Sequence, residues 1–187
     1  MINSRDWRAD RRSWIKLLKK NTGAGLAEWN CRIERHKFKD HRQLRAWLAS
    51  QQIEGYPQKL LVMERFGYPD YMLSTTHELI AKQFADRPAL RPILDKIIDE
   101  AERCGSVVVQ ARKTFVSLVS PRRTFARIQP TTKTRIDLGL RLEGQTPKGR
   151  LRSNRHDTMR LRIALTTAHE VDSEVVMWLR RAYNENS

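Results

Sequence analysis

The stretch from Lys113 to Leu142, KTFVSLVSPRRTFARIQPTTKTRIDLGLRL, constrains the fold more than any other part of this chain. In its last third, every second residue from Ile136 to Leu142 is apolar, and the residues between them are Asp, Gly and Arg. A strict period of two is typical of a strand with one buried face. The turn residues 120–123 predict a hairpin between strands at 114–119 and 124–129, and Pro130 indicates an edge or a bulge. The stretch therefore predicts an antiparallel sheet with basic residues on its outward face.

Helices are expected before and after this sheet. In the clearest one, residues 90–101, apolar side chains recur at steps of three and four and form one wide stripe. Two further strands are expected at 107–109 and 159–165. The other helices are expected at 5–20, 26–37, after an Asp40 cap, and at 57–66, 76–85 and 168–183. This order predicts the α+β class, with an amino-terminal helical bundle followed by an antiparallel β-meander flanked by helices.

The chain is long enough for two parts, and the linker at 70–75 separates them. We expect a helical domain at 1–72 and an α+β sheet domain at 76–187. The short amino-terminal helices joined by tight turns resemble a helix-turn-helix layout in outline. A bundle that only packs is the simpler alternative.

The formal charge of +15 is unevenly spread along the 187 residues. Residues 106–163 hold fourteen Lys and Arg against three acids, and residues 1–75 hold fifteen against eight. Such a chain attracts polyanions before any specific contact forms. No apolar run is long enough for a membrane span, and the two cysteines lack metal-ligand spacing. We therefore expect a cytoplasmic protein that binds nucleic acid or another polyanion. The sequence does not predict its oligomeric state.

The candidate binding residues are the cations expected on the outward sheet face and in the loop that follows it. They are Lys113, Arg127, Lys133, Arg135, Arg141, Arg160 and Arg162 on the face, with Lys148, Arg150, Arg152 and Arg155 in the loop. Arginine forks suit phosphate oxygens. The alternative is a solvated outer face with no ligand. Phe115 and Phe125 fit the core better than a stacking platform, which favours contact with a duplex backbone.

Catalytic signatures are weak. Metal-dependent nucleases need clustered carboxylates, and the sheet offers Asp137, which we expect to pair with Arg135 or Lys133, and Glu143 at its far end. The five histidines are scattered, and no Gly-rich phosphate loop, Ser/His/Asp set or Cys/His pair occurs. We therefore expect no catalytic residue, no metal site and no cofactor.

Several of these segments resemble a bacterial protein family. The matching residues are Lys113–Leu118, Ile128–Arg135, Asp137–Leu140, Gly149-Arg150, Trp178-Leu179 and Ala182-Tyr183. They look like the domain of unknown function 5655 over about residues 76–184. The residues Thr22-Gly23, Trp29, Trp47-Leu48 and Gly55-Tyr56 are similar to the short helical domain often fused before it, the domain of unknown function 4287. The resemblance implies this two-part architecture, with Leu161 where relatives are expected to carry histidine.

The function expected from the sequence is non-catalytic binding of nucleic acid, through contacts of the basic sheet face with the duplex DNA backbone. Two alternatives remain open. One is a domain that binds a small anionic ligand or an acidic protein, and the weaker one is a nuclease or another enzyme acting on a phosphorylated substrate.

Overall fold

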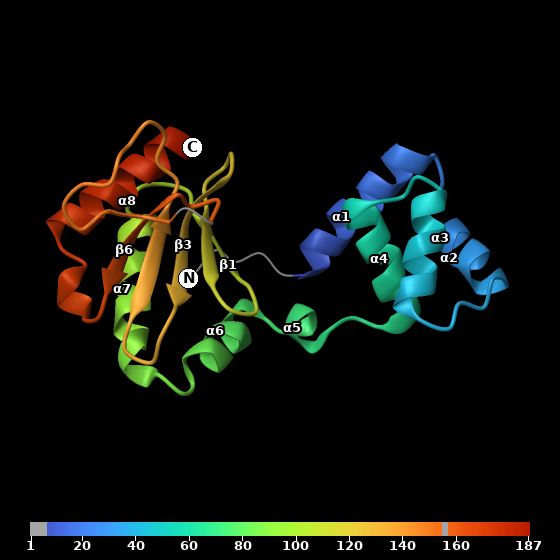
Figure 1. Ribbon diagram of the computed structural model, residues 1–187, viewed down its shortest axis with the longest axis horizontal. Coiled ribbons are helices and arrows are strands. Elements are labelled where there is room, and N and C mark those ends of the chain that lie inside the picture. Colours follow the sequence, from blue (N-terminus) through green and yellow to red (C-terminus); the bar gives the residue numbers. More distant parts are fainter. Residues whose placement is uncertain (1–6, 155–156) are drawn as a thin grey trace. The chain divides into compact units, whose positions relative to one another are not determined.

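The computed structural model describes residues 7–154 and 157–187 (Figure 1). The chain forms two compact units, Asp6–Ser74 and Thr75–Ser187, and each has its own hydrophobic core. Helices come first, and an antiparallel sheet with a carboxy-terminal helix follows, so the predicted α+β class is confirmed.

The helical unit is built from short amphipathic helices. They are α1 (Trp7–Thr22), α2 (Leu26–Arg35), α3 (His41–Ser50), α4 (Gly55–Phe66) and the one-turn α5 (Asp70–Leu73). The predicted cap is present: the Asp40 side chain accepts a hydrogen bond from the Gln43 backbone N–H over 2.8 Å. Leu18, Leu44 and Leu60 are completely buried, so the helices enclose a core of their own.

One cation of α1, Arg11, is bound by an acid and a tyrosine of the same unit. The Arg11 guanidinium donates to both carboxylate oxygens of Glu64 on α4, over 2.7 and 3.1 Å, and its Nε also lies 3.2 Å from the Tyr68 hydroxyl. The Tyr68 hydroxyl donates to Glu64 as well. Burial and the hydrogen bond to Glu64 raise the pKa of Tyr68 to about 12. Burial alone would raise the pKa of Glu64, but the hydrogen bonds from Arg11 and Tyr68 outweigh it and lower that pKa.

The second unit contains one sheet and three α-helices among its described residues. The helices are α6 (Thr76–Phe84), α7 (Arg91–Glu102) and α8 (Ser173–Asn186). The strands are β1 (Val108–Ala111), β2 (Val116–Val119), β3 (Thr124–Pro130), β4 (Ile136–Leu140), β5 (Arg152–Ser153) and β6 (Leu161–Leu165). They lie in the order β1-β2-β3-β4-β6-β5, with every neighbouring pair antiparallel. The first four form the predicted meander.

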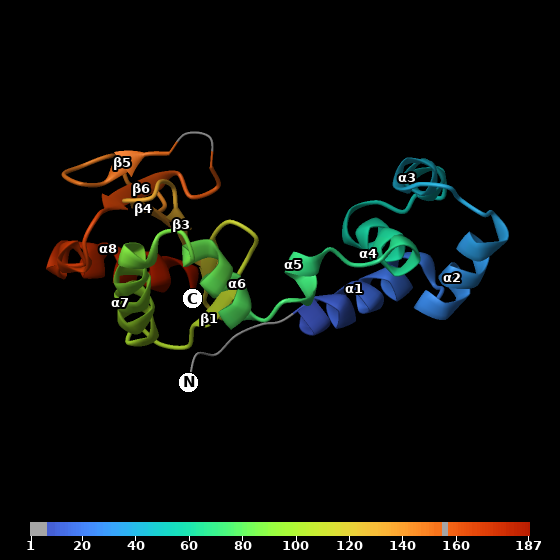
Figure 2. The same cartoon turned by 90° about the horizontal axis from the view of Figure 1, so that it is seen from below.

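One face of the sheet carries the core. Ile128, Leu138 and Ile163 are register partners on β3, β4 and β6, and all three are completely buried. Figure 2 shows α7 and α8 on the same side of these strands. Phe125 is also completely buried and meets Tyr183 of α8 edge to face, with ring centroids 5.4 Å apart. The prediction that Phe125 belongs to the core is confirmed.

Three local features differ from the expected elements, and capping explains the clearest of them. The helix expected at 168–183 is split into a 3₁₀ turn at Ala168–Glu170 and α8. Glu170 folds back to accept from the Thr167 backbone N–H, and Asp172 caps α8 through the Val175 N–H over 3.1 Å. The short α5 lies in the expected linker, and β5 lies in the expected loop.

Candidate anion-binding surface

The strand register brings several predicted site residues onto the outer face of the sheet. One row across the sheet is Ser117, Arg127, Gly139, Arg162 and Arg152, on β2, β3, β4, β6 and β5. Along the strands these residues alternate with core side chains such as Ile128, Leu138 and Ile163, and they therefore lie on the face turned away from α7 and α8. Arg127 on β3 and Arg162 on β6 are separated from each other by β4, which carries Gly139 at the matching position.

Asp137 neutralises part of this face. Arg162 Nη1 lies 2.8 Å from Asp137 Oδ2, and Arg135 Nε lies 3.2 Å from Oδ1, an ion pair without the alignment of a hydrogen bond. The Thr131 hydroxyl donates to Oδ2 over 2.9 Å. The predicted pairing of Asp137 with Arg135 is confirmed, and Arg162 is a second partner. Two of the predicted phosphate donors therefore already share a carboxylate that is only 15% exposed.

Arg127 is held on both sides. Its Nη1 donates to Asp157 Oδ2 over 2.5 Å, and its guanidinium carbon lies 4.4 Å from the centroid of the Phe115 ring. Phe115 is half-buried beneath this cation, so the prediction of a core position was wrong for this residue. Arg127 therefore occupies a face of the Phe115 ring on which a base would otherwise stack.

The loop before β6 covers the centre of the outer face. Met159 is 1% exposed, and a Cβ added to Gly139 would lie 2.9 Å from Met159 Cβ. Asp157 orders the same loop by accepting from the Met159 backbone N–H over 3.0 Å. Glycine at position 139 thus allows the loop to pack directly on the strand.

The other predicted residues lie around this centre. Arg150 donates to Asp172 over 2.8 Å and to the Glu170 carbonyl over 3.0 Å, which ties the loop to the start of α8. Arg141 Nε donates to the Thr124 carbonyl over 2.9 Å. Lys113, Lys133, Lys148, Arg152 and Arg160 are exposed, and their side chains make no hydrogen bond or ion pair with the residues that the structure describes. Arg155 lies outside the described residues.

The acids of this segment are all occupied. Residues 106–163 contain only Asp137, Glu143 and Asp157 as acids. Asp137 and Asp157 pair as described, and Glu143 Oε1 lies 2.5 Å from Arg123 Nη2. Each acid of the segment is therefore ion-paired with at least one of its arginines.

A second group of unpaired cations lies on α1. We call Arg12, Lys16, Lys19 and Lys20 the α1 stripe, because steps of three and four residues place them on one side of the helix. All four are exposed, and within the described part of the chain their side chains have no hydrogen-bond or ion-pair partner. The stripe lies away from the buried Trp14 and Leu18. The spacing of these four residues in the sequence identifies the stripe, whereas the total charge of residues 1–75 does not.

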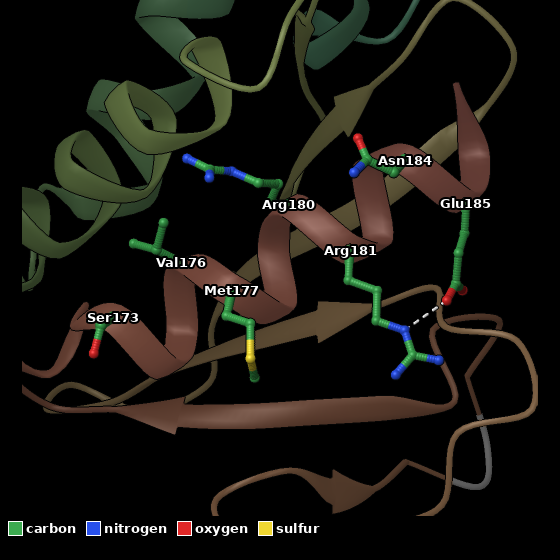
Figure 3. A pocket seen from close by; sticks show the side chains of 7 residues that line it. All are labelled: Ser173, Val176, Met177, Arg180, Arg181, Asn184 and Glu185. Atoms are coloured by element: carbon green, nitrogen blue, oxygen red, sulfur yellow. Dashed lines mark hydrogen bonds and ion pairs between the residues drawn. The ribbon is translucent and has the colours of Figure 1, made fainter.

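A groove along α8 is a weaker candidate for an anion (Figure 3). It has a volume of about 550 Å³, and its lining residues, which include Met177, Arg181 and Glu185, all come from this one helix. Arg181 Nε pairs with Glu185 Oε1 over 2.7 Å, drawn as a dashed line in Figure 3, and Arg181 Nη1 donates to Gln145 Oε1 over 2.9 Å. The charge in this groove is therefore largely satisfied.

Among residues 7–154 and 157–187, no group of three or more His, Cys, Asp or Glu side chains is placed to hold a metal ion. Within those ranges no helix combines the length and the apolarity needed to cross a bilayer. Cys31 and Cys104 are free thiols, and burial raises the pKa of Cys104.

Comparisons with known proteins identify the sheet unit. Neither the curated proteins nor the solved structures contain a match to this chain. The similarity of the helical unit to the domain of unknown function 4287 and the bacterial origin stay predictions. The family model described as Domain of unknown function (DUF5655) matches residues 80–186, which is more than half of the chain. The chain therefore belongs to the DUF5655 family.

Proposed function

We propose that this protein binds the backbone of nucleic acid, with duplex DNA as the expected form, and does so without catalysis. The contacts are made by cations whose side chains form no hydrogen bond or ion pair with the described residues: Lys113, Lys133 and Lys148 on the sheet unit, and the α1 stripe on the helical unit. The observation that carries the proposal is that the three acids of residues 106–163 are all ion-paired already. Lys113, Lys133 and Lys148 form no ion pair with any of these three acids.

The paired arginines are poor phosphate donors by comparison. To contact a phosphate, Arg127 or Arg162 would have to release a half-buried carboxylate and leave it unpaired, which is costly. An exposed lysine makes the same contact by displacing only water and counterions. We therefore propose two separate binding surfaces, the periphery of the outer sheet face on one unit and the α1 stripe on the other.

The state of the aromatic residues favours a duplex backbone over single strands. Single-strand binders stack bases on open aromatic rings. On the outer sheet face, Phe115 lies under Arg127. Phe125 is buried on the core side of the sheet, against Tyr183 of α8. The nuclease alternative has less support, because Asp137, the central carboxylate of the sheet, is held by two arginines.

The test is binding of the full chain to a fluorescent duplex between about 50 and 200 mM salt. We expect log K to fall steeply with log salt, with a slope of about −0.9 for each phosphate contacted. The variant Lys113→Glu, Lys133→Glu, Lys148→Glu should bind at least about tenfold more weakly and with a flatter slope. Poly-glutamate competitor tests the acidic-protein alternative. No duplex binding at the lowest salt, or stronger competition by poly-glutamate than by unlabelled DNA, would overturn the proposal.

A further inference from the structure

A cleft at one end of the outer sheet face brings together two of the predicted arginines. It has a volume of about 610 Å³, and Arg141, Arg160, Glu143, Thr146 and Thr158 are among its lining residues. Volumes of this size are typical of sites for small ligands. Leu142 and Leu161, which are buried, contribute its apolar part.

The two arginines line the cleft from the ends of neighbouring strands. The β4–β6 register ends with Leu140 opposite Leu161, so Arg141 directly follows β4 and Arg160 directly precedes β6. Both continue the outward positions of Gly139 and Arg162. The one acid among the described lining residues is Glu143, and its carboxylate is ion-paired with Arg123.

The guanidinium groups retain donors for a ligand. Arg141 uses Nε for the Thr124 carbonyl, which orients the group and leaves its two terminal nitrogens without a partner among the described residues. Arg160 is exposed and makes no side-chain hydrogen bond or ion pair within the described ranges. Two such forks present paired N–H donors of the geometry that binds phosphate oxygens.

We infer that this cleft binds a phosphomonoester group, with Arg141 and Arg160 on its oxygens and the exposed Thr146 hydroxyl at its side. A phosphomonoester carries a charge of about −1.5 to −2 at pH 7, which matches two guanidinium groups. A carboxylate or an internal phosphodiester, each with a single charge, matches only one. The group belongs either to a free small molecule or to the 5′ end of a nucleic-acid strand. This inference is independent of the backbone binding proposed above, which uses other residues.

The test uses the full chain and calorimetric titration with AMP, with adenosine as the control that lacks the phosphate. Arg160→Gln is the main variant, because this exposed side chain has no structural partner in the described chain. We expect AMP to bind and adenosine not to bind, and we expect Arg160→Gln to weaken AMP at least about tenfold, the usual scale for losing a charged hydrogen-bond partner. The matched control is Arg152→Gln. Arg152 is also an exposed arginine, but it lies on β5 and does not line the cleft, so this variant should change AMP affinity less than about twofold.

A second arm separates the two sources of the phosphate. A short single strand is compared with and without a 5′-phosphate. Tighter binding of the phosphorylated strand that disappears in Arg160→Gln would identify a strand end, whereas AMP binding with no difference between the strands would identify a free small molecule. Both results support the inference. It is overturned if neither AMP nor the 5′-phosphate improves on its control, or if the improvement persists in folded Arg160→Gln and Arg141→Lys.

Discussion

The outer face of the sheet and the solvent side of α1 are both basic, but they hold their charge differently. On the sheet, Asp137 is bracketed by Arg135 and Arg162, and Asp157 is bound to Arg127. On α1, the stripe contains no acid, and its four side chains form no ion pair with the described residues. Like charges four residues apart weaken a helix slightly, so this arrangement is not explained by helix stability. The comparison shows that the number of cations in a region does not tell how many of them are free to bind a ligand, because some are already ion-paired.

The largest expected effect concerns the paired region. Replacing Asp137 with alanine removes the carboxylate between Arg135 and Arg162 and leaves two half-buried cations facing each other. We expect a loss of about 2–3 kcal/mol in the free energy of unfolding of the sheet unit, somewhat below the range for fully buried pairs. Hydrogen exchange of the β3, β4 and β6 amides measures it. The control is Glu143→Ala, whose carboxylate is 68% exposed and should cost less than about 1 kcal/mol. Equal effects of the two substitutions would show that Asp137 is not a structural ion-pair centre.

A smaller effect on stability is expected in the helical unit, where Arg11 of α1 is paired with Glu64 and the α1 stripe is unpaired. Burial raises the pKa of Tyr68 in this network to about 12, above its ordinary value near 10. A raised pKa in the folded state means that stability is intact below pH 10 and is lost as the pH rises from about 10 to 12. We expect a loss of about 1 kcal/mol after allowing for solvent screening at this partly exposed site.

This alkaline loss is measured by tryptophan fluorescence during urea unfolding, since four of the five tryptophans lie in the helical unit. It should be absent in Tyr68→Phe. Tyr56→Phe is the matched control, because that side chain is 58% exposed, and it should keep the wild-type pH profile. An unchanged profile in Tyr68→Phe would contradict the proposed coupling of Tyr68 to Glu64 and Arg11.

The fold was predictable wherever the pattern was local. Alternation from Ile136 to Leu140 predicted β4, and the stripe from Ile93 to Ala101 predicted α7. The split before α8 was missed because it depends on Glu170 folding back on Thr167, a capping choice that periodicity does not reveal.

The candidate site was predictable only in part. The outward positions of Arg127 and Arg162 followed from strand parity, and the Asp137–Arg135 pair from their spacing of two residues. The Arg127–Asp157 pair joins residues thirty positions apart and depends on how the loop before β6 packs on Gly139. Sequence spacing carries no information about that path, so it could not show which cations are already used.

The most direct test of the difference between paired and unpaired cations removes the same charge from each region. Arg12→Gln with Lys16→Gln removes two unpaired cations of the α1 stripe. Arg123→Gln with Arg135→Gln removes two paired ones, and Arg162 remains on Asp137 to keep the sheet folded. Duplex affinity is then measured across a salt series for both variants. We predict that the stripe variant loses up to about 1.8 units of salt slope, about 0.9 for each contact, and that the paired variant keeps the wild-type slope. Equal loss of slope in both variants would contradict the account, because total charge and not its pairing would then govern binding.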